Sequence, residues 1–227
     1  MIFAVASNNP GKIKEIQRIL DAAGHEAKSQ RELGFDLEVE ETGTTFEANA
    51  LLKARALCAQ SGLPTIADDS GLCVEALGGA PGVYSARYCG RHGDDEANND
   101  KLLAELEGLP REKRAAKFVS AVCLCMPDGR SLTAMGECPG WVGFERRGEN
   151  GFGYDPIFYV GERSYAELAD REKDGLSHRG KALALLGRAL PEFWKDPQGF
   201  GPAGAQIVIR DGEQNAAARP RTEQRAF

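Results

Sequence analysis

Apolar residues follow two different periods along the first part of the chain. Continuous apolar runs at residues 2–6 and 63–67 predict short buried strands. In residues 13–20 and 46–57 the apolar positions instead recur every three or four residues, which predicts two helices with one buried stripe each. Strands that alternate with helices in this way are typical of an α/β fold.

The ends of these two helices carry signals of their own. Asn9 is a predicted N-cap with Pro10 at the first helical position, and Gly24 is a predicted stop. Thr44 and Glu47 have the spacing of a capping box, so we expect the second helix to begin directly after Thr44. The first strand therefore leads through a short loop into the start of a helix.

The middle of the chain has the pattern of strands joined by turns. Predicted strand pairs lie at 72–77 with 83–88 and at 118–126 with 131–138, and a further strand lies at 156–160. Helices are predicted around residues 102–106, after Ser164 and over 179–190. Hairpins in the middle and strand–helix units near the start predict an α/β fold with a mixed sheet.

The composition changes near residue 197. From there to residue 227 the chain is rich in Gly, Pro, Ala, Gln and Arg, with one apolar patch at residues 207–209. Few core-forming residues predict a mobile C-terminal extension over 197–227, in which the apolar patch could add an edge strand. We therefore expect the chemistry to lie in one domain over residues 1–196.

Composition and charge argue against several classes of protein. The 227 residues are 42% apolar and 27% charged, as in an ordinary soluble globular protein. The 28 basic and 34 acidic residues give a net charge of −6, which argues against nucleic acid as a partner. We expect no membrane span and no signal peptide, because the apolar runs are short. The six cysteines lack CxxC or zinc-type spacing, so we expect buried reduced thiols and a cytoplasmic protein.

The loop over residues 7–12 joins a predicted strand to a predicted helix. Backbone N–H groups and the helix dipole favour an anion at such a position, and Lys12 adds a positive charge in the first turn. A phosphate group would suit this loop. The residues alone also fit a capped helix with a solvated lysine, because the loop is not a Walker A sequence.

Two pairs of carboxylates precede small-residue turns. Glu40 and Glu41 form one pair, and Asp68 and Asp69 form the other. Hard oxygen ligands of this type suit Mg²⁺, which commonly takes one or two carboxylates together with substrate phosphates. Neighbours in an extended chain point to opposite faces, so each pair would offer one carboxylate to a shared site. The residues alone do not say which one, and two polar turns would give the same pattern.

Five further residues have both a functional and a structural interpretation. Asn49 and Lys53 lie one helical turn apart, off the apolar stripe, which also fits an ordinary surface lysine. Phe152 stands between glycines, where its ring could stack on a ligand or pack inside the protein. His178 and Arg179 open the last predicted helix and offer many hydrogen-bond donors, or a simple helix cap.

Five sequence segments, taken together, carry a resemblance to one family. In chain order they are SNNPGK, EETGTTFEANALLKA, IADDSGLCVEALGGAPGVYSARY, NGFGYDPIF and SHRGKAL. The chain resembles the inosine/xanthosine triphosphate pyrophosphatases over about residues 1–195. This resemblance implies an elongated mixed sheet with flanking helices, two lobes around a central cleft, and a homodimer.

The resemblance also implies a role for each matched residue. Asp69 matches the catalytic carboxylate that accepts a proton from water, Glu41 with Asp69 matches a Mg²⁺ site, and Asp68 matches a supporting acid. The phosphate contacts would be Ser7, Asn8, Asn9, Pro10, Gly11, Lys12 and Lys53, with Ser70 as a further substrate contact. The nucleoside pocket would consist of Phe152, Gly153, Tyr154, Asp155, Lys173, His178 and Arg179.

The reaction implied is the Mg²⁺-dependent hydrolysis of inosine, deoxyinosine and xanthosine triphosphates to the monophosphate and pyrophosphate. One alternative is a catalytically silent protein that binds or senses purine nucleotides. Such a protein would have little reason to keep both Glu41 and Asp69. A second alternative is a pyrophosphatase of related fold for modified pyrimidine or methylated nucleotides, which the SHR and NGFGYDP segments disfavour.

Overall fold

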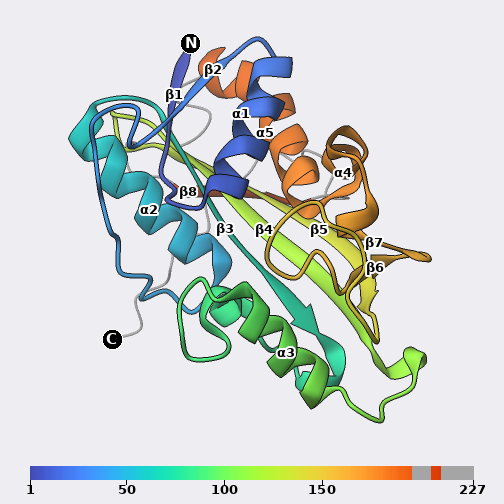
Figure 1. The fold of residues 1–227 in the computed structure, drawn as a ribbon. Coiled ribbons are helices and arrows are strands. Elements are labelled where there is room, and N and C mark those ends of the chain that lie inside the picture. Colours follow the sequence, from blue (N-terminus) through green and yellow to red (C-terminus); the bar gives the residue numbers. More distant parts are fainter. Residues whose placement is uncertain (196–205, 211–227) are drawn as a thin grey trace, which may run out of the picture.

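The computed structural model describes residues 1–195 and 206–210, and within this part of the chain eight strands form one mixed sheet (Figure 1). The strand order is β2-β1-β3-β4-β5-β6-β7, and β8 pairs with β5. Strand β1 is parallel to β2 and β3, and β8 is parallel to β5, whereas the other pairs are antiparallel. The strands are β1 (Ile2–Val5), β2 (Glu26–Ser29), β3 (Thr65–Val74), β4 (Ala115–Cys125), β5 (Ser131–Val142), β6 (Phe158–Val160), β7 (Arg163–Ser164) and β8 (Gln206–Arg210).

Helices cover both faces of this sheet. They are α1 (Pro10–Ala22), α2 (Phe46–Ser61), α3 (Asp95–Glu105), α4 (Asp170–Leu176) and α5 (His178–Lys195). Phe3 and Val5 of β1 pack with α1 and α5, whereas Ala4 and Ala6 pack with α2 on the opposite face. The period-2 alternation of a strand therefore assigns each residue to one helical layer.

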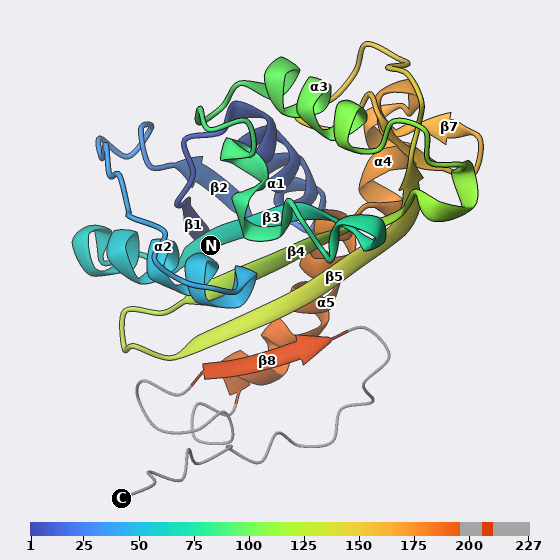
Figure 2. The same cartoon turned by 90° about the horizontal axis from the view of Figure 1, so that it is seen from below.

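Three long strands join two lobes. Strands β3, β4 and β5 contain 10, 11 and 12 residues, and they extend from the α2 end of the sheet to the β7 end (Figure 2). A separate core lies at the far end, where Leu102 of α3 packs with Phe118, Phe158 and Tyr165. The α/β class and the elongated mixed sheet with two lobes are thus confirmed.

The structure corrects the predicted turn directly after Asp69 and the predicted strand at 83–88. Strand β3 runs without interruption, because every residue from Thr65 to Val74 pairs with β4. Residues Gly82–Arg87 form a 3₁₀ helix that packs against β3, and Ser85 Oγ accepts the N–H of Leu72 at 2.9 Å. A Cβ at Gly71 would clash with this helix, so glycine there permits a close approach, not a turn.

Local signals predicted some boundaries and missed others. Asn9 caps α1 and accepts the N–H of Lys12, as predicted. The N-cap of α2 is Thr45 and not Thr44, because the Thr45 side chain accepts the N–H of Ala48. Strand β2 was not predicted, since its sequence EAKS has no apolar pattern and depends on pairing with β1.

Part of the predicted C-terminal extension is the strand β8. Ile207 and Ile209 are partly buried against the core that α1 and α5 cover, and Val208 is exposed. Arg210 forms an ion pair with Glu47 of α2 at 2.7 Å. The apolar patch therefore adds a strand to the β5 edge, while the rest of residues 197–227 lies outside the described part. None of the described helices has the length and hydropathy needed to span a membrane.

Candidate active site

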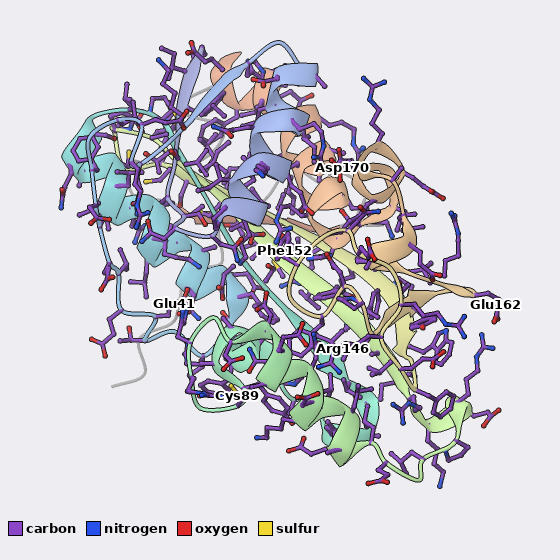
Figure 3. All side chains as sticks on the ribbon, in the orientation of Figure 1. Glu41, Cys89, Arg146, Phe152, Glu162 and Asp170 are labelled. Carbon is purple, nitrogen blue, oxygen red and sulfur yellow. The ribbon has the colours of Figure 1, made fainter. Side chains whose placement is uncertain are left out.

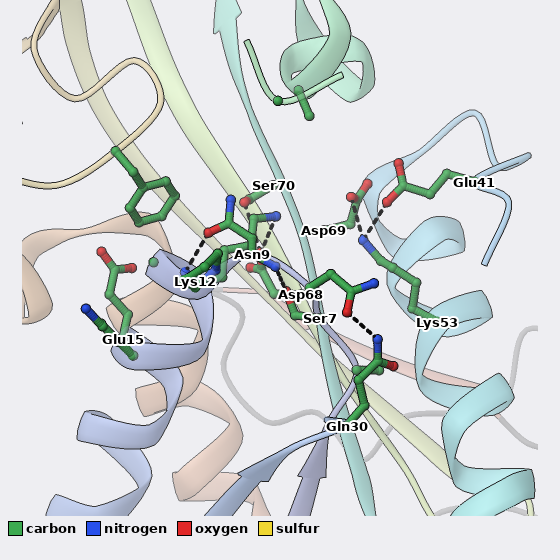
Figure 4. A pocket seen from close by; sticks show the side chains of 18 of the residues that line it. Ser7, Asn9, Lys12, Glu15, Gln30, Glu41, Lys53, Asp68, Asp69 and Ser70 are labelled. Carbon is green, nitrogen blue, oxygen red and sulfur yellow. Dashed lines mark hydrogen bonds and ion pairs between the residues drawn. The ribbon is translucent and has the colours of Figure 1, made fainter. Parts of the chain in front are cut away.

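A cavity of about 1380 Å³ opens between the two lobes, beside the middle of β3 (Figure 4). Helices α1 and α2 border it on two sides, and Phe152 and Glu41, labelled in Figure 3, both contribute to its wall. Thirteen of the residues proposed from the sequence line this cavity: Ser7, Asn8, Asn9, Pro10, Gly11, Lys12, Glu41, Lys53, Asp68, Asp69, Ser70, Phe152 and Lys173. Gly153, Tyr154, Asp155, His178 and Arg179 are not among its lining residues.

The alternation of β3 separates the two adjacent aspartates. Ile66 belongs to the core under α1 and α5, and Ala67 belongs to the core under α2. Continuing the same alternation, Asp68 points toward α1 and α5, and Asp69 points toward α2. The two carboxylates therefore enter different environments, as expected for neighbours in an extended chain.

Asp68 is fully enclosed by hydrogen-bond donors. Its Oδ2 lies 2.8 Å from Lys12 Nζ and 3.1 Å from Arg179 Nη2 and accepts the hydroxyl of Ser70, while Ser120 Oγ donates to Oδ1 at 2.5 Å. Burial alone would raise the pKa of Asp68, but the charges of Arg179 and Lys12 outweigh burial and hold that pKa well below its usual range. Asp68 is thus a permanent anion that organises its neighbours and has little capacity left for a metal ion.

Asp69 has fewer partners and faces the cavity. Its Oδ1 accepts from Lys53 Nζ at 2.9 Å, and its Oδ2 accepts from Asn49 Nδ2 at 3.3 Å. Burial raises the pKa of Asp69 despite the nearby charge of Lys53. A carboxylate with a raised pKa in a cleft is a suitable proton acceptor.

Glu41 and Asp69 converge on one point, the Nζ of Lys53 (Figure 4). Their oxygens lie 2.8 and 2.9 Å from it, and the second oxygen of Glu41 pairs with Arg87 at 3.2 Å. Two hard oxygen donors side by side fit Mg²⁺, which takes its other ligands from water and substrate phosphates. The part of the chain that the structure describes holds no group of three or more His, Cys, Asp and Glu arranged for a metal.

The loop between β1 and α1 forms the floor beside these carboxylates. Ser7 Oγ accepts the N–H of Asn9, and Asn9 in turn accepts the N–H of Lys12 at 3.0 Å. Asn8 is held by Gln30, whose Nε2 donates to its Oδ1 at 2.6 Å. This loop is therefore fixed by short-range hydrogen bonds before any ligand arrives.

A buried ionic network adjoins the same cavity, which Glu15 of α1 and Lys173 of α4 help to line. Lys173 Nζ bridges Glu15 at 2.8 Å and Asp155 at 2.6 Å, and Arg179 bridges Glu15 and Asp68. Burial would lower the pKa of Lys173, but Asp155 and Glu15 outweigh burial and raise it. The network holds both cations in a charged state.

The Phe152 ring covers these two cations. Lys173 Nζ lies 4.9 Å from the ring centroid, and the Arg179 Cζ lies 5.7 Å from it. The ring also packs on Gly11, where any Cβ would clash with it. Phe152 therefore bridges the phosphate loop and the cations of the predicted nucleoside pocket.

His178 and Tyr154 are buried next to this region. The His178 ring stacks on Phe118 at 4.6 Å, and burial together with Arg179 holds its pKa well below the usual value. His178 Nδ1 and Arg179 Nε are buried without a hydrogen-bond partner. Tyr154 donates its hydroxyl to the carbonyl of Ser85 at 3.0 Å, which gives it a packing contact with the 3₁₀ helix.

Sequence reasoning missed several residues that the fold brings to the site. Glu15 follows Lys12 by three positions, so helical spacing could have placed both on one face of α1. Arg87 lies inside the SARY segment but was not assigned a role. Asn49 was singled out beside Lys53 but was assigned no role, and its side chain is fully buried.

Comparison with known proteins decides the family. The model of the Ham1 family matches residues 3–189. The chain belongs to the Ham1 family. Among Ham1 relatives, the dITP/XTP pyrophosphatase of Bacillus subtilis is 48% identical over 82% of this chain and 95% of its own length. The protein of the same name from Haemophilus influenzae is 52% identical over 81% of this chain and 96% of its own.

Solved structures of Ham1 proteins share the fold. The Ham1 protein of Staphylococcus aureus is 42% identical and aligns with a TM-score of 0.74 over 85% of this chain and 99% of that chain. The nucleoside-triphosphatase / dITP/XTP pyrophosphatase of Mycobacterium abscessus is 49% identical, with a TM-score of 0.65 over 82% of this chain and 97% of its own. The family resemblance inferred from the five sequence segments is therefore confirmed.

Proposed function

We propose that this Ham1 family protein hydrolyses dITP, ITP and XTP to the nucleoside monophosphate and pyrophosphate with Mg²⁺ as cofactor. One observation carries the proposal. Asp69 and Glu41 meet at Lys53 in a cavity whose floor is the loop over residues 7–12. The names of the relatives from Bacillus subtilis and Haemophilus influenzae support the same activity.

Each residue of this group has a role in the proposed reaction. Asp69 accepts a proton from the water that attacks the α-phosphorus, the bond to the bridging oxygen breaks, and pyrophosphate leaves. Lys12 and Lys53 neutralise the triphosphate charge, and Arg87 adds a third cation at the same wall of the cavity. When bound, Mg²⁺ held by Glu41 and Asp69 would supply further neutralisation of the phosphates.

The nucleoside pocket favours a purine with an oxygen at position six. Arg179 does not line the cavity, but its Nε is a buried donor without a partner, and its guanidinium lies close to Phe152, which does line the cavity. A 6-oxo group that reached past this ring would satisfy the donor. Adenine carries an amino group at that position and would set donor against donor. We expect kcat/KM to decrease in the order dITP or XTP, then GTP, then ATP.

A panel of nucleoside triphosphates tests the proposed function. Release of pyrophosphate from dITP and XTP separates the enzyme from a silent nucleotide-binding protein. Higher kcat/KM on modified pyrimidine or methylated nucleotides than on dITP would instead favour the other pyrophosphatase class. Omission of Mg²⁺, with Ca²⁺ and Mn²⁺ as replacements, tests the proposed metal.

Three further properties complete the proposal. The net charge of −6 supports a free nucleotide, and not a nucleic acid, as the substrate. Six free cysteines support a reducing compartment, so we place the protein in the cytoplasm. The resemblance of the sequence implies a homodimer, which sedimentation would test, with residues 1–196 as the catalytic domain.

A further inference from the structure

Asn49 stands in the first turn of α2 with its side chain completely buried. Its Nδ2 donates to Asp69 Oδ2 at 3.3 Å, and its Oδ1 accepts the N–H of Gly43 at 2.8 Å. One amide thus joins the proposed base on β3 to the segment that carries Glu41. Asn49 is not the cap of α2, because Thr45 holds that position.

Lys53, one turn further along α2, joins the same two parts of the site. Its Nζ donates to Asp69 Oδ1 and to Glu41 Oε1. Helix α2 therefore holds Asp69 and the segment over residues 41–43 through two parallel bridges. One bridge is a neutral amide, and the other is a cation.

A bound substrate would redirect the Lys53 side chain but not the Asn49 side chain. Lys53 lines the cavity, and its charge would turn toward the triphosphate when both carboxylates hold a metal ion. Asn49 does not line the cavity and carries no charge, so a ligand has no reason to redirect it. Of the two bridges from α2, only that of Asn49 is then left.

We propose that Asn49 is a positioning residue for the pyrophosphatase reaction. Its N–H₂ group fixes the orientation of the Asp69 carboxylate, and its carbonyl oxygen fixes the backbone next to Glu41. This inference rests on the proposed function, because it assigns Asn49 to the same reaction.

Gly43 packs so closely against Asn49 that no side chain fits at position 43. A Cβ at position 43 would lie 2.6 Å from Asn49 Oδ1 and 2.8 Å from the Cβ of Ala48. Any larger residue would therefore push the 41–43 segment away from α2. Hydrogen bonds that orient a reacting or metal-binding group commonly account for about 10- to 100-fold of the activity.

The test compares Asn49→Ala with Asn98→Ala in the full-length protein. Asn98 is a matched control, since it is 2% exposed and accepts the N–H of Cys89 at 2.8 Å through the same type of amide. With dITP and Mg²⁺, we expect Asn49→Ala to lower kcat about 10- to 100-fold with KM little changed. Asn98→Ala should lower the melting temperature by a similar amount and keep the parental kcat.

Parental kcat in Asn49→Ala, or a loss of kcat equal to that of Asn98→Ala, would overturn the inference. If Asn49→Ala does not fold, Asn49→Asp replaces it, because aspartate keeps the size and the acceptor for Gly43. It presents an oxygen to Asp69 in place of the N–H₂ group, so we expect kcat to fall at least as far. A parental kcat in Asn49→Asp would also overturn the inference.

The controls separate this inference from the proposed function. A parent protein without activity on dITP would remove the proposed function itself. An active parent with an inactive Asp69→Asn variant and a fully active Asn49→Ala variant would remove only the positioning role of Asn49.

Discussion

Asp68 and Asp69 are neighbours in β3, yet their carboxylates face opposite layers of helices and their pKa values shift in opposite directions. Asp68 is paired with Lys12 and Arg179, which lower its pKa against the effect of burial. Burial raises the pKa of Asp69. Two carboxylates in contrasting environments commonly divide their roles, so we assign structure to Asp68 and proton transfer to Asp69.

Asp69→Asn should lower kcat on dITP by about 10² to 10⁴, the range expected when a general base is removed. Its melting temperature should stay near that of the parent, because asparagine keeps the size of the side chain and a bond to Lys53. Steady-state kinetics and a thermal melt measure both effects. Near-parental turnover in this variant, with Asp68→Asn inactive but fully stable, would mean that the roles are reversed.

Asp68→Asn should act mainly on stability. The change leaves the buried Arg179 and the partly buried Lys12 without their shared anion, and such a loss costs about 3 kcal/mol of the free energy of unfolding. Chemical denaturation of the apo protein measures this difference, with Asp69→Asn as the adjacent control. Equal denaturation midpoints for Asp68→Asn and the parent would contradict the structural role.

His178 should make the protein less stable in mild acid. Burial holds the pKa of His178 well below its usual value, so the unfolded chain binds the proton more tightly than the folded one. The resulting loss of free energy of unfolding is absent above about pH 6.5, the pKa of His178 in the unfolded chain. Below that pH the loss grows by about 1.4 kcal/mol per pH unit, until the pKa of His178 in the folded protein is reached.

The measurement compares the parent with His178→Phe, whose ring can keep the stack on Phe118. Between pH 8 and 5.5, the parent should lose about 1.4 kcal/mol more of its free energy of unfolding than the variant does. Identical pH dependence in the two proteins would show that His178 titrates normally in the folded state.

Arg179→Ala should lose its activity selectively on 6-oxo purines. The variant also leaves Glu15 and Asp68 without a cation, so its absolute activity mixes two effects. A loss of folded protein lowers the activity on all substrates alike and leaves the ratio of their kcat/KM values unchanged. We expect the ratio of kcat/KM for dITP over dATP to fall on the order of 10². An unchanged ratio would leave Arg179 as a scaffold residue only.

Strand β8 should contribute to stability although it lies beyond the 3–189 range of the family match. Ile209 packs against the core, so Ile209→Ala should lower the free energy of unfolding by about 1 to 2 kcal/mol. Val208 is 37% exposed, and Val208→Ala should change the free energy of unfolding by less than about 0.5 kcal/mol. Equal effects of the two substitutions would mean that β8 does not pack on the sheet in solution.

Features that depend on local residues could be predicted from the sequence. The cap at Asn9 and the hairpin of β4 and β5 follow from neighbouring side chains. The turn predicted directly after Asp69 was wrong because ten pairs with β4 hold the Asp-Ser-Gly segment extended. Local turn preference is weaker than this continuous pairing.

The residues of the site also divide into those that the sequence predicts and those that only the fold reveals. The motif segments are long and specific, so they identified Lys12, Glu41, Lys53 and Asp69 from the sequence. All four residues line the cavity. Asn49 lies in the same segment as Glu41 and Lys53, but its role could not be assigned from the sequence, since that role depends on where β3 and the 41–43 segment lie in three dimensions. A buried amide between two loops or strands can be recognised only when the fold is known.

Hydrolysis of dITP in water enriched with ¹⁸O tests the central claim most directly. Asp69-assisted attack of water on the α-phosphorus places the label in deoxyinosine monophosphate and none in pyrophosphate, and mass spectrometry of the two products measures this. We expect one labelled oxygen per molecule of monophosphate. Label in pyrophosphate or in inorganic phosphate, or no monophosphate at all, would contradict the account.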